Sequence, residues 1–262
     1  MGWVTVLVVA AVAIMLIALL VLRRRGKADE GGGSASVDFS ANLALAVYLL
    51  VLAYAAVLCR DALSTAQTDV QAEAETLTEM YWSVAPIPEA APIRAQIRDY
   101  AAKSVDLDWP LMAEGQLSPI PTRMLEDMRA ATIRLRPVGE ESKSLQQDAL
   151  SHVSEVAHAR AIRADDADAG LESIFVISMI VSGMLVVALP WTLGAKPTFA
   201  SVVGDGVRVG VVVVGIGFIM LISHPFAGLG SVGPDAFKAA QKQYDQIDDR
   251  FPVTSAAPVA AE

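Results

Sequence analysis

Four long apolar stretches limit what this chain can fold into. Residues 3–22 contain no charged side chain, residues 43–58 form a shorter run, residues 174–193 a third, and residues 209–222 a fourth that is rich in glycine. A helix needs about 20 mostly apolar residues to cross a bilayer, because lipid offers no partners for backbone polar groups. The stretches therefore predict an all-α integral membrane protein with four transmembrane helices.

The boundaries of the predicted segments follow from the polar residues between the runs. Basic residues come after the first run, in the sequence RRRGK, which favours an uncleaved anchor over a secretory signal. The predicted segments are transmembrane helices over 1–22, 41–59, 171–193 and 207–225, a flexible basic and Gly/Ser-rich loop over 23–40, an extramembrane domain over 60–170, a short loop over 194–206, and a C-terminal segment over 226–262 with a disordered end.

Composition agrees with a membrane protein that also has a large polar part. The mean hydropathy is +0.46, which is too apolar for an ordinary soluble domain. The net charge is −9 and no basic tract suits nucleic acid, so no nucleic-acid partner is expected. Cys59 is the single cysteine, which excludes an internal disulfide and any site built from several cysteines.

The second apolar run is predicted to continue as one helix well beyond the membrane. Leu63, Val70 and Leu77 recur at seven-residue intervals, with other apolar residues between them and one gap at Glu73. That pattern is typical of an amphipathic helix. We expect the helix to stop at Pro86, because proline cannot donate a backbone hydrogen bond.

The rest of the extramembrane segment also reads as helices. Apolar spacing predicts one helix over 93–104 that ends before Trp109, a second over 124–135, and a third that begins near Glu140. No run of period two and no hairpin signal occurs there. We therefore expect a helical bundle between the second and third spans, with most of its acidic charge on solvated faces.

Charge in the short loops predicts the orientation. The loop after the first span holds four basic residues, and the loop before the fourth span holds Lys196 and ends near Arg208. Loops rich in Lys and Arg stay in the cytoplasm. This bias predicts a multi-pass plasma-membrane protein whose termini and helical domain lie outside the cytoplasm.

The sequence contains no constellation typical of an enzyme. It has no G-x-S-x-G, phosphate-binding loop or HExxH motif, and His152 and His158 are six residues apart, which places them on different faces of a helix. The glycines of VVGDGVRVG lie in an apolar run, where they favour close helix packing over dinucleotide binding. We therefore expect no catalytic residue, no metal site and no cofactor.

Four ionisable residues beside the membrane are candidates for an ion path or gate. They are Glu172 before the third span, Asp205 and Arg208 before the fourth, and His224 after it. Asp205 and Arg208 are three residues apart and could pair on one helix face. The alternative is that all four are interfacial groups, with His224 in the headgroup layer next to Pro225.

Two motifs together resemble the bestrophin-like domain family, a group of bacterial membrane proteins. One is IRAQIRDYAAKSVDLDWPLM in the middle, and the other is SHPFAGLGSVGPDAF near the end. The resemblance extends over residues 43–244, and Ser223 stands where many members carry an acidic residue. The residues that carry the resemblance are Tyr100, Trp109, Pro110, His224, Pro225, Phe226, Gly228, Pro234 and Phe237.

The resemblance implies a channel, because bestrophins proper are anion channels that assemble as rings. It also implies a cytoplasmic helical segment, which is the opposite of what the loop charges predict. Two functional hypotheses stay open: a channel or pore-forming oligomer, and a non-catalytic membrane scaffold or accessory subunit whose helical domain binds a protein. Membrane lipid, further copies of the chain and another membrane protein are the partners expected.

Overall fold

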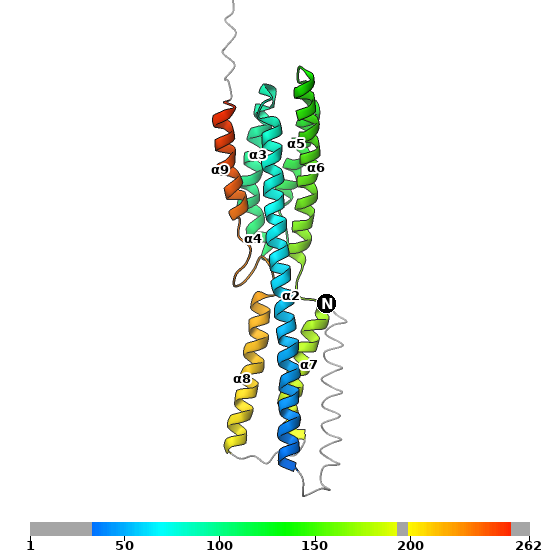
Figure 1. Ribbon diagram of the computed structural model, residues 1–262, viewed down its shortest axis with the longest axis vertical. Helices are drawn as coiled ribbons and strands as arrows, with labels where there is room; N and C mark the ends of the chain where they lie inside the picture. Colours follow the sequence, from blue (N-terminus) through cyan, green and yellow to red (C-terminus); the bar gives the residue numbers. More distant parts are fainter. Residues whose placement is uncertain (1–32, 193–198, 253–262) are drawn as a thin grey trace, which may run out of the picture. The chain divides into compact units, whose positions relative to one another are not determined.

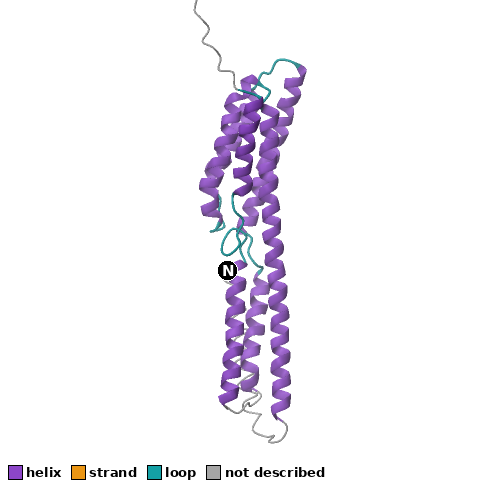
Figure 2. Ribbon diagram, turned by 60° about the vertical axis from the view of Figure 1, so that its left-hand side comes forward, coloured by secondary structure: helices purple, strands orange, loops and turns teal. Residues whose placement is uncertain are grey.

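The computed structural model describes residues 33–192 and 199–252, and the regular elements in these residues are all helices (Figure 2). No strand occurs in these two ranges. The predicted all-α character is therefore confirmed for the described part of the chain.

The chain divides into two compact units. Unit 1 comprises Met1–Asp61 and Gly170–Ser223, and unit 2 comprises Ala62–Ala169 and His224–Glu262. The long helix α2 (Gly33–Val84) contributes its first part to unit 1 and its second part to unit 2 (Figure 1). The predicted continuation of the second span into the extramembrane domain is therefore present as one unbroken helix.

Three described helical stretches are long and apolar enough to cross a membrane. They are Phe39–Val84, Glu140–Thr192 and Val203–Ile222, and their apolar parts lie in α2, in α7 (Ser173–Thr192) and in α8 (Phe199–Ile222). The first predicted span, over residues 1–22, lies outside the described residues. The finding is thus three candidate spans, where the sequence predicts four.

Unit 1 packs α2, α7 and α8 around a single tyrosine. Tyr48 is fully buried, and its hydroxyl donates a hydrogen bond of 2.9 Å to the backbone oxygen of Val212 in α8. Gly183 of α7 and Gly215 of α8 make room for it, because a Cβ atom at Gly215 would lie 2.4 Å from the Tyr48 oxygen. The two glycines let α7 and α8 approach Tyr48 closely.

Many other apolar side chains of unit 1 point away from this core. Leu50 and Val214 are both 71% exposed, and Val213 is 62% exposed. In water such a surface would be unfavourable, whereas lipid tails are as apolar as leucine. The distribution agrees with helices that are solvated by lipid.

Unit 2 is a helical bundle whose core includes the second part of α2. Its other elements are η1 (Pro88–Ala90), α3 (Ala91–Lys103), η2 (Ser104–Asp108), α4 (Trp109–Met112), α5 (Pro119–Arg134), α6 (Glu140–Asp168) and α9 (Asp235–Arg250). Val70 and Leu77 of α2 lie in the core with Ile97 of α3, Met128 of α5 and Val153 of α6. The apolar stripe predicted for α2 is therefore its buried face.

The structure corrects one detail of the predicted bundle and adds two. The helix that begins with α3 does not end before Trp109, because the π-helical η2 carries it on into α4. Pro119 begins α5, where the Ser118 hydroxyl accepts a hydrogen bond of 3.3 Å from the Ile120 amide. Helix α9 was not predicted.

Candidate functional site: a buried charge cluster

Unit 2 buries an arginine at its centre. Arg163 of α6 is fully buried, and its Nε lies 2.7 Å from Oε2 of Glu73, which is also fully buried. Its Nη2 lies 3.1 Å from the other oxygen of Glu73 and 3.2 Å from Oδ2 of Asp108. Burying a charge is costly unless it is paired and hydrogen-bonded, and this geometry meets both conditions.

A second arginine completes the cluster from one turn away on α6. Both carboxylate oxygens of Asp108 accept from Arg160, whose Nη2 lies 3.1 Å from Oδ1. The same nitrogen donates to the backbone oxygen of Ser118 at 2.8 Å, and the Ser118 amide donates to Asp108 at 3.0 Å. Two arginines thus balance two carboxylates, and we call Glu73, Asp108, Arg160 and Arg163 the buried charge cluster.

The π-helical segment η2 helps to place Asp108. A π turn holds one more residue than an α turn, so the helix faces after it rotate by about 100°. Asp108 is the last residue of η2, and its side chain is fully buried against both arginines. Such single π turns occur often at functional sites.

Aromatic side chains enclose the cluster. The Arg163 guanidinium carbon lies 5.2 Å from the ring centre of Trp109 and 5.3 Å from that of Phe237, distances at which a cation is attracted to an aromatic ring. The Tyr100 hydroxyl donates to Glu73 at 2.7 Å. Burial, and then the negative charge of Glu73, raise the pKa of Tyr100 well above its ordinary value, so this hydroxyl stays protonated.

The loop between α8 and α9 contacts Trp109, which lies against Arg163 of the same cluster. The Val232 amide donates to the Pro225 oxygen at 2.8 Å, and the Val232 oxygen accepts from the Trp109 indole nitrogen at 3.1 Å. Gly228 and Gly230 have φ angles of +84° and +79°, which favour glycine. Trp109 therefore links the cluster to the loop between α8 and α9.

A second, partly exposed cluster holds the far end of α9. Asp248 accepts from Tyr81 at 2.8 Å and pairs with Arg98 at 2.7 Å and with Arg94 at 3.0 Å. Tyr81 stacks on Tyr244 of α9 with 4.5 Å between the ring centres. Burial raises the pKa of Tyr81 to about 12, whereas hydrogen bonds from Tyr81 and Arg98 outweigh burial and lower the pKa of Asp248.

The motif residues predicted from the sequence fall in this part of unit 2. Tyr100, Trp109 and Phe237 contact the buried charge cluster directly, and Phe226 belongs to the same apolar core. Pro110 lies in the first turn of α4, Pro225 and Gly228 shape the loop, and Pro234 precedes α9. His224 is exposed at the start of the loop.

The four predicted ion-path residues do not form one described cluster. Asp205 and Arg208 pair at 2.9 Å, as their spacing predicts, and each side chain is about one-fifth exposed. Glu172 is exposed just before α7. These three residues belong to unit 1 and His224 belongs to unit 2, so the predicted ion path stays a prediction.

Sequence reasoning missed the four charged residues of the cluster, although a signal was present. Glu73 occupies a position of the apolar stripe of α2, where it was noted only as a gap. Arg160 and Arg163 continue the series Ala149, Val153 and Val156 at intervals of four and three. A charged residue within the apolar stripe of a helix indicates that its side chain is buried and pairs with an opposite charge on another helix.

The arrangement can hold helices together, because it joins α2, η2 and α6 through charges and α9 through Phe237. Within residues 33–192 and 199–252, no three His, Cys, Asp or Glu side chains converge as a metal site.

A family model for the bestrophin-like domain matches residues 4–237, which is most of the chain. The chain belongs to the bestrophin-like domain family. The match begins earlier than the resemblance noted from the motifs, includes the first apolar run and ends at Phe237, so that it contains all nine motif residues. No curated protein and no solved structure matches this bestrophin-like chain significantly. Membership and the three apolar helices show a membrane protein of this family.

Proposed function

We propose that this bestrophin-like protein forms a channel-like, pore-forming oligomer in the plasma membrane, without enzymatic activity. The observation that carries the proposal is a face of small residues on α8 that no described residue covers, which we call the uncovered face. Family membership supports it, because bestrophins proper are channels that assemble as rings.

The glycines of α8 fall into two groups. Gly215 packs on Tyr48 in the core of unit 1, whereas no described residue comes within 4 Å of a Cβ atom built at Gly204, Gly206, Gly210 or Gly217. Intervals of four and seven residues place Gly206, Gly210 and Gly217 on one face, opposite the buried Val212, while Gly204 lies on another face.

In lipid, helices associate through close packing and not through the hydrophobic effect. A face with Gly206 and Gly210 four residues apart allows two backbones to approach closely. The Asp205–Arg208 pair lies at the start of the same helix, where a neutralised pair is far less costly than a single charge. These features favour α8 as the helix that meets further copies of the chain around a path.

Cysteine cross-linking with ion flux tests the proposal. We expect Val213→Cys, on the uncovered face and in a Cys59→Ala background, to form disulfide-linked dimers in membranes. Phe218→Cys is a matched control, because Phe218 is 52% exposed but points about 120° away from Gly206. Purified protein in liposomes should conduct ions; a strict monomer, or cross-linking without flux at any voltage, would contradict the channel.

The loop charges support an orientation with unit 2 outside the cytoplasm. Val138 is 86% exposed in unit 2, so a cysteine introduced there in the Cys59→Ala background should react with a membrane-impermeant thiol reagent on intact cells. Reaction only after permeabilisation would place unit 2 in the cytoplasm.

The second candidate function is a membrane scaffold or accessory subunit. A groove on unit 2 favours this function. If the correctly folded protein did not conduct ions, the scaffold would explain the structure better than the channel.

A further inference from the structure

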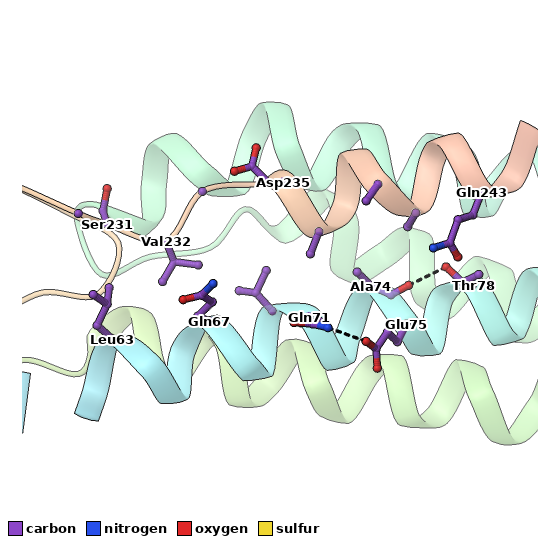
Figure 3. A pocket seen from close by; sticks show the side chains of 16 residues that line it. Leu63, Gln67, Gln71, Ala74, Glu75, Thr78, Ser231, Val232, Asp235 and Gln243 are labelled. Carbon is purple, nitrogen blue, oxygen red and sulfur yellow. Dashed lines mark hydrogen bonds between the residues drawn. The ribbon is translucent and has the colours of Figure 1, made fainter. Parts of the chain in front are cut away.

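A groove runs along α2 beside α9 in unit 2 (Figure 3). Its cavity has a volume of about 450 Å³ and is bounded by α2, by the loop before α9 and by α9 itself. The α2 residues that line it extend from Leu63 to Thr78 at intervals of three and four. They form one stripe of about four turns, or about 22 Å.

The floor of the groove is made of small side chains and its rim of amides. Ala74 of α2 and Ala239 of α9 line it with small side chains, and the exposed side chains of Gln67, Gln71 and Gln243 line it too. Small residues on two helices leave room for a third helix between them. The groove therefore has the length and the lining for a helical segment.

A second cavity of about 370 Å³ lies on the α6 side of α2. It shares Glu75, Thr78 and Gln243 with the first cavity and is also lined by Glu79 and Glu155. We call the two cavities together the acidic trough.

The charges of the acidic trough have one sign. Its carboxylates are Glu75, Glu79, Glu155 and Asp235, and no Lys or Arg occurs among the described residues that line either cavity. His152 lies 3.4 Å from Glu155 at the edge. A cleft lined by one sign of charge attracts a ligand of the other sign.

We propose that the acidic trough docks a basic amphipathic helix of a partner protein, with small or aliphatic side chains on the face that enters the groove. The four carboxylates are spread along the trough and do not converge on one point, which fits several cationic side chains better than one metal ion. A helix in a groove is a common mode of peptide recognition. The C-terminal residues of the chain do not fit the charge, because residues 253–262 contain no Lys or Arg.

Fluorescence anisotropy with the full chain in uncharged maltoside micelles tests the proposal. The probe is a labelled 18-residue helical peptide of Ala, Leu and Lys, and the matched peptide has Glu in place of Lys. We expect saturable binding of the Lys peptide that weakens as salt is added, and no binding of the Glu peptide or to empty micelles.

Three variants locate the binding. Ala239→Trp places an indole in the groove and should weaken binding more than tenfold. Glu75→Gln with Asp235→Asn should weaken it about three- to tenfold, as expected for two exposed charge pairs. Glu126→Gln is the control, because Glu126 is an exposed carboxylate on α5 that lines neither cavity.

Equal binding to Ala239→Trp and to the unaltered protein would overturn the proposal, provided circular dichroism shows both folded. So would tight binding of spermine alone that displaces the peptide, which would assign the trough to small organic cations. Self-association that Ala239→Trp abolishes would assign it to a second copy. Ion flux and Val213 cross-linking should be unchanged in these variants, so failure here is separate from failure of the channel proposal.

Discussion

The cores of the two units differ in what they bury. Unit 1 packs by shape: Tyr48 fits against glycines, and its hydroxyl reaches a helix carbonyl. Unit 2 buries two arginines and two carboxylates in its centre, with side chains between fully buried and 6% exposed. The packing of its helices is therefore specified by the pairing of charges as well as by the fit of side chains.

The contrast agrees with the prediction that unit 1 lies in lipid and unit 2 in water. Helices in lipid gain little by hiding apolar side chains, so close contact through glycine matters more there. Unit 2 gains from apolar burial in water, and that gain can offset the desolvation of paired charges. Among the described residues of unit 1 the one ion pair, Asp205–Arg208, stays partly exposed.

Breaking the buried charge cluster should give the largest effect. Arg163→Met leaves the Glu73 carboxylate buried with only Tyr100 as a described partner, and loss of one member of a buried pair costs about 3–5 kcal/mol. The measurement is thermal unfolding of the purified chain in detergent, followed by tryptophan fluorescence, because Trp82 and Trp109 both lie in unit 2.

Two variants control that experiment. Lys143→Met breaks an exposed pair with Glu140 and should change stability little. Arg163→Lys keeps the charge but not the forked geometry, so its stability should lie between those of Arg163→Met and Lys143→Met. This variant still tests the cluster if Arg163→Met does not fold. The cluster would not be central if Arg163→Met unfolded no earlier than Lys143→Met.

Filling the space beside Tyr48 should have the next largest effect. A methyl group at Gly215 would meet the Tyr48 oxygen at 2.4 Å, so Gly215→Ala should destabilise unit 1 by about 1–3 kcal/mol. Tyr48→Phe alone should cost about 1 kcal/mol, since the hydrogen bond to Val212 is lost. Thermal unfolding of helical circular dichroism measures both.

The double variant tests whether the clash with the Tyr48 oxygen causes the loss of stability in Gly215→Ala. In the Tyr48→Phe background Gly215→Ala should cost less, because the clashing oxygen is gone. Gly204→Ala is the control, since no described atom lies within 4 Å of a Cβ atom there. Equal costs for Gly215→Ala and Gly204→Ala would show that unit 1 tolerates a looser fit.

The sequence predicts the features of this molecule that depend on local pattern. The apolar runs and the seven-residue spacing of Leu63, Val70 and Leu77 predict the long helix α2 and its buried face. The resemblance to the bestrophin-like family includes Trp109 in one motif and Phe237 in the other. It does not show that both rings lie against Arg163, because that contact joins three distant segments of the chain.

The features that the sequence does not predict depend on tertiary partners. Arg163 and Glu73 are 90 residues apart, so neither explains the other until α2 and α6 pack. The turn of η2 carries no distinctive residue pattern. Helix α9 follows a glycine-rich loop and is largely polar, but Phe237, Tyr244 and Ile247 form one buried stripe that could have revealed it.

The smallest expected effect is a pH dependence at the end of α6. Burial, and then the negative charge of Asp69, raise the pKa of Asp166 to about 6 from an ordinary value of 3.8. Because the folded state holds this proton more tightly than the unfolded chain does, the stabilisation it gives is complete below about pH 4 and is lost as pH rises through 6. Asp166→Asn should remove that loss and raise the melting temperature at pH 7.5 by about 1–2 °C, a small effect because the side chain is only partly buried.

Melting curves at pH 4, 5, 6 and 7.5 measure this effect, with Asp127→Asn on α5 as an exposed control. The unaltered protein and Asp127→Asn should lose stability in parallel between pH 4 and 6, while Asp166→Asn should lose less. If all three curves stayed parallel, Asp166 would be ionised in the folded protein at pH 5. Unit 2 would then accommodate an ionised carboxylate next to Asp69 without an arginine partner, unlike Glu73 and Asp108 in its core.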